Sequence, residues 1–138
     1  MSLSLPLVSH LIAALTILFL GIIVYFHDKK SSTNKILFLH TLVITLWTIA
    51  NYFSITASQG ESLFWIRLVI FFAVPHVFLF FLFVFSFPER ELNIRPLSTF
   101  FYSLGLLIGG IIALSPYGFS GIQVTGELVK PVAGPLMP

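Results

Sequence analysis

The sequence contains no cysteine, and only 9% of its 138 residues are charged. The lack of cysteine excludes disulfide bonds, thiolate metal sites and cysteine nucleophiles within these residues. The scarcity of charge excludes an ordinary soluble domain, in which about a quarter of the residues are charged. The net charge at pH 7 is only +2, and lysine and arginine form no cluster of the kind that binds nucleic acid. No nucleic-acid partner is therefore expected.

Hydrophobic residues make up 57% of the chain, and the mean hydropathy is +1.03. They form four continuous runs, at residues 7–26, 36–55, 63–87 and 97–114. Each run is near the ~20 residues that a helix needs to cross a bilayer. Continuous runs also differ from the alternating segments of a transmembrane barrel. The sequence therefore predicts an all-α, polytopic membrane helix bundle with four transmembrane helices, and the lipid bilayer as its first partner.

The loops between the runs differ in basic content. Loop 56–62 holds no basic residue. Loops 27–35 and 88–96 together hold five: Lys29, Lys30, Lys35, Arg90 and Arg95. Basic loops remain in the cytoplasm. The N-terminus, loop 56–62 and the tail from residue 115 are then expected on the opposite side of the membrane, outside the cell.

The tail, residues 115–138, is rich in proline and glycine, with short β-prone segments on either side of Gly126 and Glu127. This pattern predicts an extracellular β-hairpin. A hairpin alone outside the membrane is poorly supported. We therefore expect one domain over 1–138, with a membrane part at 1–114, that is incomplete at its C-terminal end.

The second run carries a wide polar face. One stripe of residues follows helical spacing: His40, Ile44, Trp47 and Asn51. A second stripe has the same spacing one residue further along the chain: Thr41, Thr45, Thr48 and Tyr52. Such residues either bond back to the helix or across to a neighbour, or they line a ligand cavity. The opposite side is expected to face lipid: Leu39, Val43, Leu46, Ala50 and Phe53.

The third run begins near Trp65, whose ring suits the outer membrane interface. Arg67 is expected to reach the surface, or to bond with Asn51, Glu61, an anionic ligand or a carboxylate on a further helix. Pro75 removes one backbone hydrogen bond and should kink the helix.

His76 follows Pro75 in the middle of the third run. We expect either a histidine bonded to a hydroxyl or a freed carbonyl, or a sensor of protons or of a ligand. His40 is expected nearer the cytoplasm, and His10 lies at the outer end. No metal-ligand spacing is present, so no metal site is predicted.

The fourth run contains a row of small residues, Gly105, Gly109 and Ala113. Such a row permits close helix packing, either within the chain or in a homodimer. No phosphate loop, nucleophile elbow or pair of buried carboxylates is present. No cofactor is expected, and the chain by itself is not expected to be an enzyme.

Several local features occur together: Trp47 and Asn51 in the second run, Trp65-Ile66-Arg67, Pro75, an aromatic run to Pro88, and Gly134-Pro135-Leu136. In this combination the chain resembles the N-terminal seven-helix membrane region of bacterial sensor histidine kinases, a region also found ahead of diguanylate cyclases. The resemblance implies that helices five to seven and a cytoplasmic signalling module complete the protein.

The main hypothesis is a membrane sensor region that perceives a stimulus and passes it to a cytoplasmic output module, of kinase or cyclase type. Six residues are candidates for its sensing or structural core: Trp47, Asn51, Trp65, Arg67, Pro75 and His76. The alternative is a small four-helix membrane protein that acts as a transporter piece or an assembly subunit.

Overall fold

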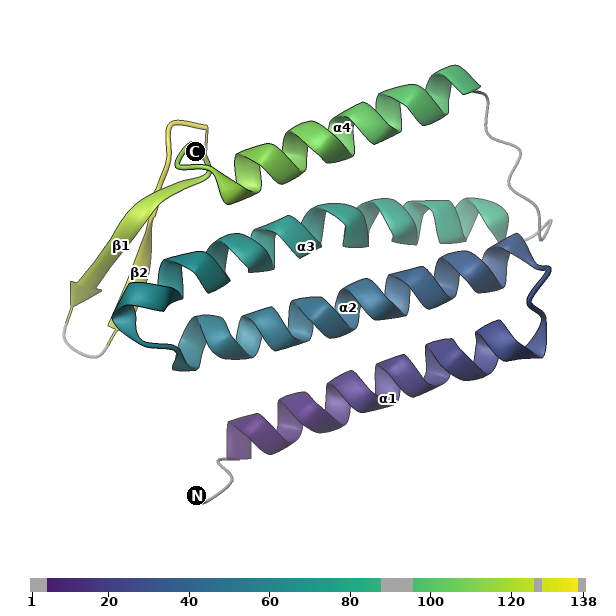
Figure 1. Ribbon diagram of the computed structural model, residues 1–138, viewed down its shortest axis with the longest axis horizontal. Helices are drawn as coiled ribbons and strands as arrows, with labels where there is room; N and C mark the ends of the chain where they lie inside the picture. Colours follow the sequence, from purple (N-terminus) through teal and green to yellow (C-terminus); the bar gives the residue numbers. More distant parts are fainter. Residues whose placement is uncertain (1–4, 88–95, 126–127, 137–138) are drawn as a thin grey trace.

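A computed structural model describes residues 5–87, 96–125 and 128–136. In these residues it has six elements: α1 (Leu5–His27), α2 (Ser32–Thr56), α3 (Gln59–Ser86), α4 (Pro96–Leu114), β1 (Phe119–Thr125) and β2 (Leu128–Ala133). The helices run back and forth side by side, and the strands lie at the end where α2 finishes and α3 begins (Figure 1). The all-α bundle and the hairpin are thus confirmed.

The helix lengths match a membrane. Helices α1, α2 and α3 have 23, 25 and 28 residues, and each is long and apolar enough to cross a bilayer. Helix α4 has 19 residues, or about 29 Å at 1.5 Å per residue. Three predicted spans are confirmed by this measure, and the fourth predicted span, 97–114, coincides with α4.

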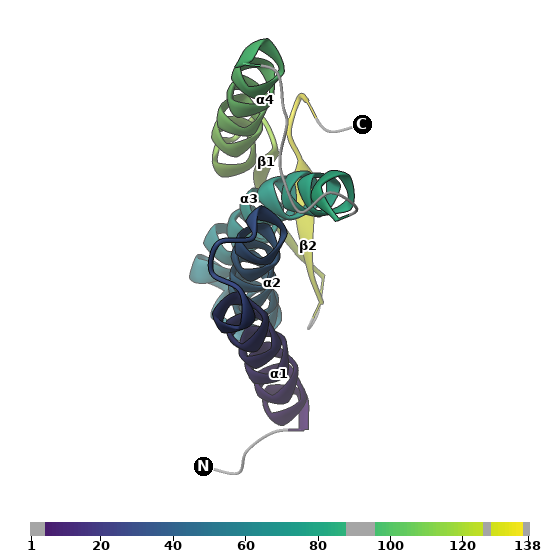
Figure 2. The ribbon, with the colours of Figure 1, turned by 90° about the vertical axis from the view of Figure 1, so that its right-hand side faces the viewer.

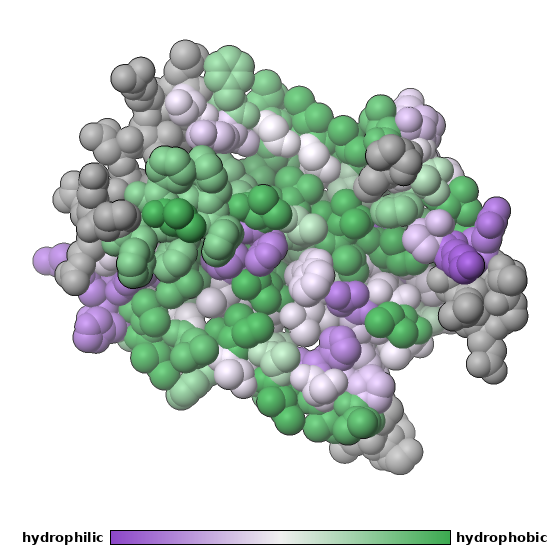
Figure 3. Space-filling model, turned by 180° about the vertical axis from the view of Figure 1, so that it is seen from behind, coloured by the Kyte–Doolittle hydropathy of each residue, from purple (hydrophilic) through white to green (hydrophobic). Residues whose placement is uncertain are grey.

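The helices form a row and not a closed bundle. Helix α1 packs on α2, α2 on α3, and α3 on α4, and the view down the helices shows them in one layer from α1 to α4 (Figure 2). Large apolar side chains remain exposed on the outer faces, such as Leu15 at 65% and Leu107 at 61%. The space-filling view shows apolar residues over much of one face (Figure 3). Such a surface suits lipid.

Small residues set the helix spacing. At Gly21 an added Cβ would overlap the Thr41 side chain of α2. At Gly109 it would lie 3.0 Å from Val74 of α3, and Ala113 is 1% exposed. At Gly105 nothing lies within 4 Å. Gly109 therefore lies close against α3 and Ala113 is buried, whereas Gly105 makes no close contact with the described neighbours.

Strands β1 and β2 pair antiparallel from Phe119↔Ala133 to Thr125↔Leu128, with an irregularity between Phe119 and Gly121. The Gly134 amide donates to the Gly118 carbonyl at 2.7 Å, and a Cβ at Gly134 would run into the backbone of Tyr117. The glycine permits this close approach. The predicted turn at 126–127 lies outside the described residues.

Candidate sensory site

The threonines of α2 are buried and bonded within their own helix. The hydroxyls of Thr41, Thr45 and Thr48 donate to backbone carbonyls three or four residues earlier, each at 2.8 Å. Thr45 also lies 3.5 Å from the Ala14 carbonyl of α1. These bonds satisfy the hydroxyls inside an apolar layer. The packing interpretation is confirmed for these threonines.

One residue of the predicted lipid side is misplaced. Ala50 is only 1% exposed, whereas Leu39, Leu46 and Phe53 are between 39% and 48% exposed. On α2, Ala50 lies between His40 and Phe53, both of which contact α3. The prediction that Ala50 faces lipid is wrong because α3 covers that sector of α2.

Two histidines meet between α2 and α3. The His40 Nε2 lies 3.0 Å from the His76 Nδ1, and the two rings stack at 4.8 Å with 12° between their planes. His40 is 7% exposed, and the Phe80 ring lies 5.9 Å from it. One ring must donate and the other accept, so the bond needs one shared proton.

This contact corrects one expectation and agrees with another. Among the described residues His76 bonds to neither a hydroxyl nor a freed carbonyl but to the His40 ring, and His40 lies slightly nearer than His76 to the end of the layer where α2 begins. Helices α2 and α3 are antiparallel; His40 lies eight residues after the start of α2, and His76 ten residues before the end of α3. At 1.5 Å per residue the two positions differ in depth by about 3 Å. The described residues contain no group of three metal-binding side chains.

Arg67 joins α3 to the hairpin. Its Nε and Nη2 both donate to the Phe119 carbonyl, at 3.3 and 2.7 Å. Among the described residues Arg67 forms neither the hydrogen bond with Asn51 nor the ion pair with Glu61, two of the alternatives that the sequence left open. Its partner is 52 residues away in the sequence, so local spacing could not reveal it.

Trp65 packs against α2, and Pro75 lies inside α3. The Trp65 ring stacks on Phe53 of α2, with centroids 4.5 Å apart. Helix α3 continues from Gln59 to Ser86 through Pro75. Both residues therefore belong to the α2–α3 layer that carries the histidine pair.

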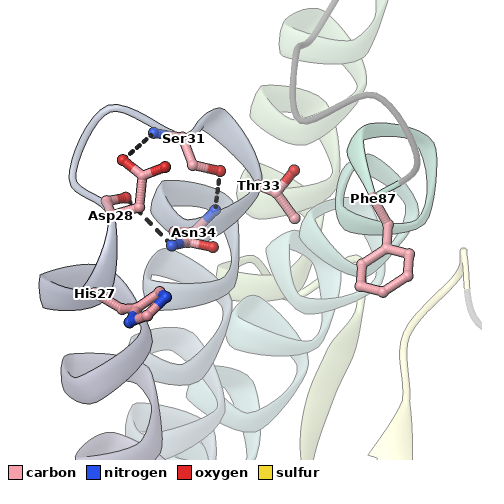
Figure 4. A pocket seen from close by; sticks show the side chains of 6 residues that line it. All are labelled: His27, Asp28, Ser31, Thr33, Asn34 and Phe87. Atoms are coloured by element: carbon pink, nitrogen blue, oxygen red, sulfur yellow. Dashed lines mark hydrogen bonds between the residues drawn. The ribbon is translucent and has the colours of Figure 1, made fainter.

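The turn between α1 and α2 holds a polar pocket of about 270 Å³, lined by His27, Asp28, Ser31, Thr33, Asn34 and Phe87 (Figure 4). The Asp28 carboxylate accepts from the backbone amides of Lys30 and Ser31 at 3.0 and 3.3 Å. The Asn34 side chain donates to the Asp28 carbonyl at 3.2 Å. Thr33 donates to the Ser86 carbonyl at 2.8 Å. These bonds hold the turn together and tie α2 to the end of α3.

A different cleft, of about 300 Å³, lies between the first half of α1 and the second half of α2. It is lined by Ser9, His10, Ala13, Trp47, Thr48 and Asn51. The structure thus brings two of the predicted residues, Trp47 and Asn51, together with His10. The His10 Nδ1 lies 2.7 Å from the Pro6 carbonyl, and its ring is 5.6 Å from that of Tyr52. The sequence reasoning missed His10, although a histidine inside an apolar run was a visible signal.

Comparison with known proteins agrees with this geometry. The family described as the N-terminal 7TM region of histidine kinase matches residues 9–127, from the first helix into the hairpin. No curated protein and no solved structure matches the chain. The matched region is a sensory membrane region and not the catalytic part of these kinases. The chain therefore belongs to the family of N-terminal seven-transmembrane regions of histidine kinases.

Proposed function

We propose that this chain is the sensory membrane region of a bacterial two-component histidine kinase, and that it transmits a stimulus from its outer half to a cytoplasmic kinase module. The family match supports a membrane sensor with a kinase downstream. In this proposal residues 1–114 form the membrane part and 115–138 an outer segment. Helices five to seven complete the bundle. The family match does not favour the alternative of a transporter piece or assembly subunit.

The observation that carries the proposal is the His40–His76 bond. Among the described residues it is the sole hydrogen bond between two side chains, and it joins α2 to α3 at a position where His40 is buried. A polar link of this kind has two discrete states, made and broken. A stimulus that favours one state shifts the two helices relative to each other.

The same helices are joined again at their inner ends, where Thr33 donates to the Ser86 carbonyl. A shift of α2 against α3 at the histidine pair would therefore reach the inner end of α3. We propose that this end passes the signal to the output module, and that the output is a kinase because the matching family is that of histidine kinases.

Sensing is tested on the complete protein with its kinase module in proteoliposomes. His76→Leu should change the autophosphorylation rate because it breaks the polar link between α2 and α3. Phe80→Leu is the matched control, since it alters the ring beside His40 without removing the link. If neither His76→Leu nor any other substitution in the α2–α3 layer alters the autophosphorylation rate, the proposal is wrong.

The proposed orientation puts the N-terminus and hairpin outside, and loops 27–35 and 88–96 in the cytoplasm. The basic residues of the α1–α2 turn support this arrangement. The hairpin and that turn lie at opposite ends of the helices (Figure 1).

The absence of cysteine makes the orientation simple to test. Single cysteines are introduced at two exposed positions, Ser120→Cys in β1 and Lys30→Cys in the α1–α2 turn. A membrane-impermeant maleimide should label Ser120→Cys in intact cells, and Lys30→Cys only after permeabilisation. The reverse pattern would refute the orientation.

A further inference from the structure

We infer that the outer cleft lined by His10, Trp47 and Asn51 binds a small uncharged ligand that carries a hydrogen-bond donor and acceptor next to a flat ring. The inference rests on the proposed sensory function and specifies the ligand class for it. Among the described residues this cleft brings three polar side chains without hydrogen-bond partners, from two helices, to one cavity.

The polar groups in this cleft are unpaired. The Asn51 carboxamide, the Trp47 indole N–H and the His10 Nε2 form no hydrogen bond with any residue that the structure describes. At the inner pocket, by contrast, Asp28, Thr33 and Asn34 are all bonded. None of these unpaired atoms is buried, and Trp47 is 36% exposed, so all three groups can be reached by a molecule in the cleft. A ligand that carries matching donors and acceptors would bond to them.

The available atoms define what the ligand must offer. A carbonyl only accepts, so the His10 Nδ1 carries the proton that is donated to Pro6, which leaves Nε2 of the neutral ring as an acceptor. Asn51 adds one acceptor and two donors, and Trp47 adds one donor and a ring face. No Asp, Glu, Lys or Arg lines the cleft. A charged ligand would lose its hydration without gaining a counter-charge.

The size and place of the cleft also fit a small ligand. Its volume of about 300 Å³ lies at the lower end of small-molecule sites. A second cavity, of about 220 Å³, lies on the other side of His10 and Thr48 and is lined partly by Leu7, Ile49 and Phe53. That side of α2 carries exposed apolar residues and suits lipid chains. The polar cleft lies on the opposite side.

Binding there would act on helix positions. His10 belongs to α1, whereas Trp47 and Asn51 belong to α2. A ligand bonded to both helices would hold α1 against α2 on the outer half. Asn51 lies on the same helix as His40, three turns away, so the bound ligand would bias the helix that carries the histidine pair.

Benzamide is the probe, because it joins an uncharged donor and acceptor to one flat ring. The chain is placed in lipid nanodiscs as the Trp65→Phe variant, so that Trp47 is its remaining tryptophan and reports by fluorescence. Benzamide should change the emission in a saturable manner. Benzoate, which is charged, and toluene, which lacks polar groups, should not produce a saturable change.

Two variants locate the site. Asn51→Leu and His10→Phe should each weaken benzamide binding roughly ten-fold, the expected effect of losing a well-placed hydrogen bond. Ser54→Ala is the matched control: its hydroxyl bonds to the Asn51 carbonyl of the same helix, outside the cleft. It should bind as tightly as the parent, and circular dichroism should show that all variants remain helical.

Three results would overturn the inference: no saturable change with benzamide, equal binding of benzoate or toluene, or unaltered binding in both variants. If His76→Leu still alters phosphorylation while benzamide does not bind, the ligand assignment fails and the sensory function stands. If benzamide binds but no α2–α3 perturbation alters phosphorylation, the sensory function fails instead.

Discussion

Gly21 should be the position where the smallest substitution does the most damage to the α1–α2 pair. It is buried in α1, and the Thr41 side chain of α2 lies directly over it. A single added methyl group would overlap the Thr41 hydroxyl, and it would lie 2.9 Å from the Thr41 Cβ and 3.1 Å from its Cγ2. Carbon atoms in contact normally lie about 3.5–4.0 Å apart.

Gly21→Ala must therefore push α1 and α2 apart by roughly 1 Å, against van der Waals packing that membrane helices rely on. Overpacking of this kind costs about 1–3 kcal/mol. Gly105→Ala is the matched control, since it makes the same change inside α4, where no described neighbour lies within 4 Å. Alanine favours the helix by up to about 1 kcal/mol over glycine, so this variant should be neutral or slightly stabilising.

The assay is reversible unfolding in bicelles by added SDS, followed by circular dichroism. Gly21→Ala should lower the free energy of unfolding, and Gly105→Ala should not. Adding Thr41→Ala to Gly21→Ala should recover part of the loss, because it removes the overlapping hydroxyl. Equal effects of the two glycine variants, or no recovery with Thr41→Ala, would refute the reasoning.

Three further outcomes are expected. His76→Leu leaves the buried His40 ring without a partner and should lower the free energy of unfolding by about 1–3 kcal/mol. In the same assay, the variant with Leu at both positions should lose less than the sum of the two single variants. Strictly additive losses would contradict the link. Arg67→Met should speed amide hydrogen exchange in β1 and leave exchange in α3 unchanged, with Arg67→Lys intermediate; an unchanged β1 would show that the guanidinium does not anchor the hairpin. Gly109→Leu overpacks α4 against α3 and should destabilise the chain by about 1–3 kcal/mol, measured by the same SDS titration; a neutral result would mean that α4 is not held by this contact.

The helices were predictable because membrane burial is a local property. Each span follows from about 20 consecutive apolar residues, and the predicted runs differ from the observed helices mainly at their ends, as at Ser32, four residues before the predicted start. The hairpin was predictable for the same reason, since β-prone segments and turn residues are close in the sequence.

The candidate site was only partly predictable. Trp47 and Asn51 were identified from their place on a polar helix face, and the structure puts both at one cleft. Their partner His10 belongs to another helix, so it could not be assigned from the spacing within α2. The Arg67 partner is a backbone carbonyl, which no residue type marks in a sequence.

The sequence by itself determined that this protein has apolar helices for a membrane, a hairpin after the fourth helix, and polar chemistry concentrated in the second and third helices. Hydropathy, helical period and turn composition decide these features within one segment at a time. Only the tertiary structure decided which polar groups meet: His40 with His76, Arg67 with the hairpin, and His10 with the α2 cleft. Those pairings depend on where each helix ends and how neighbouring helices are aligned in depth, and a shift of two residues along an axis is enough to change them.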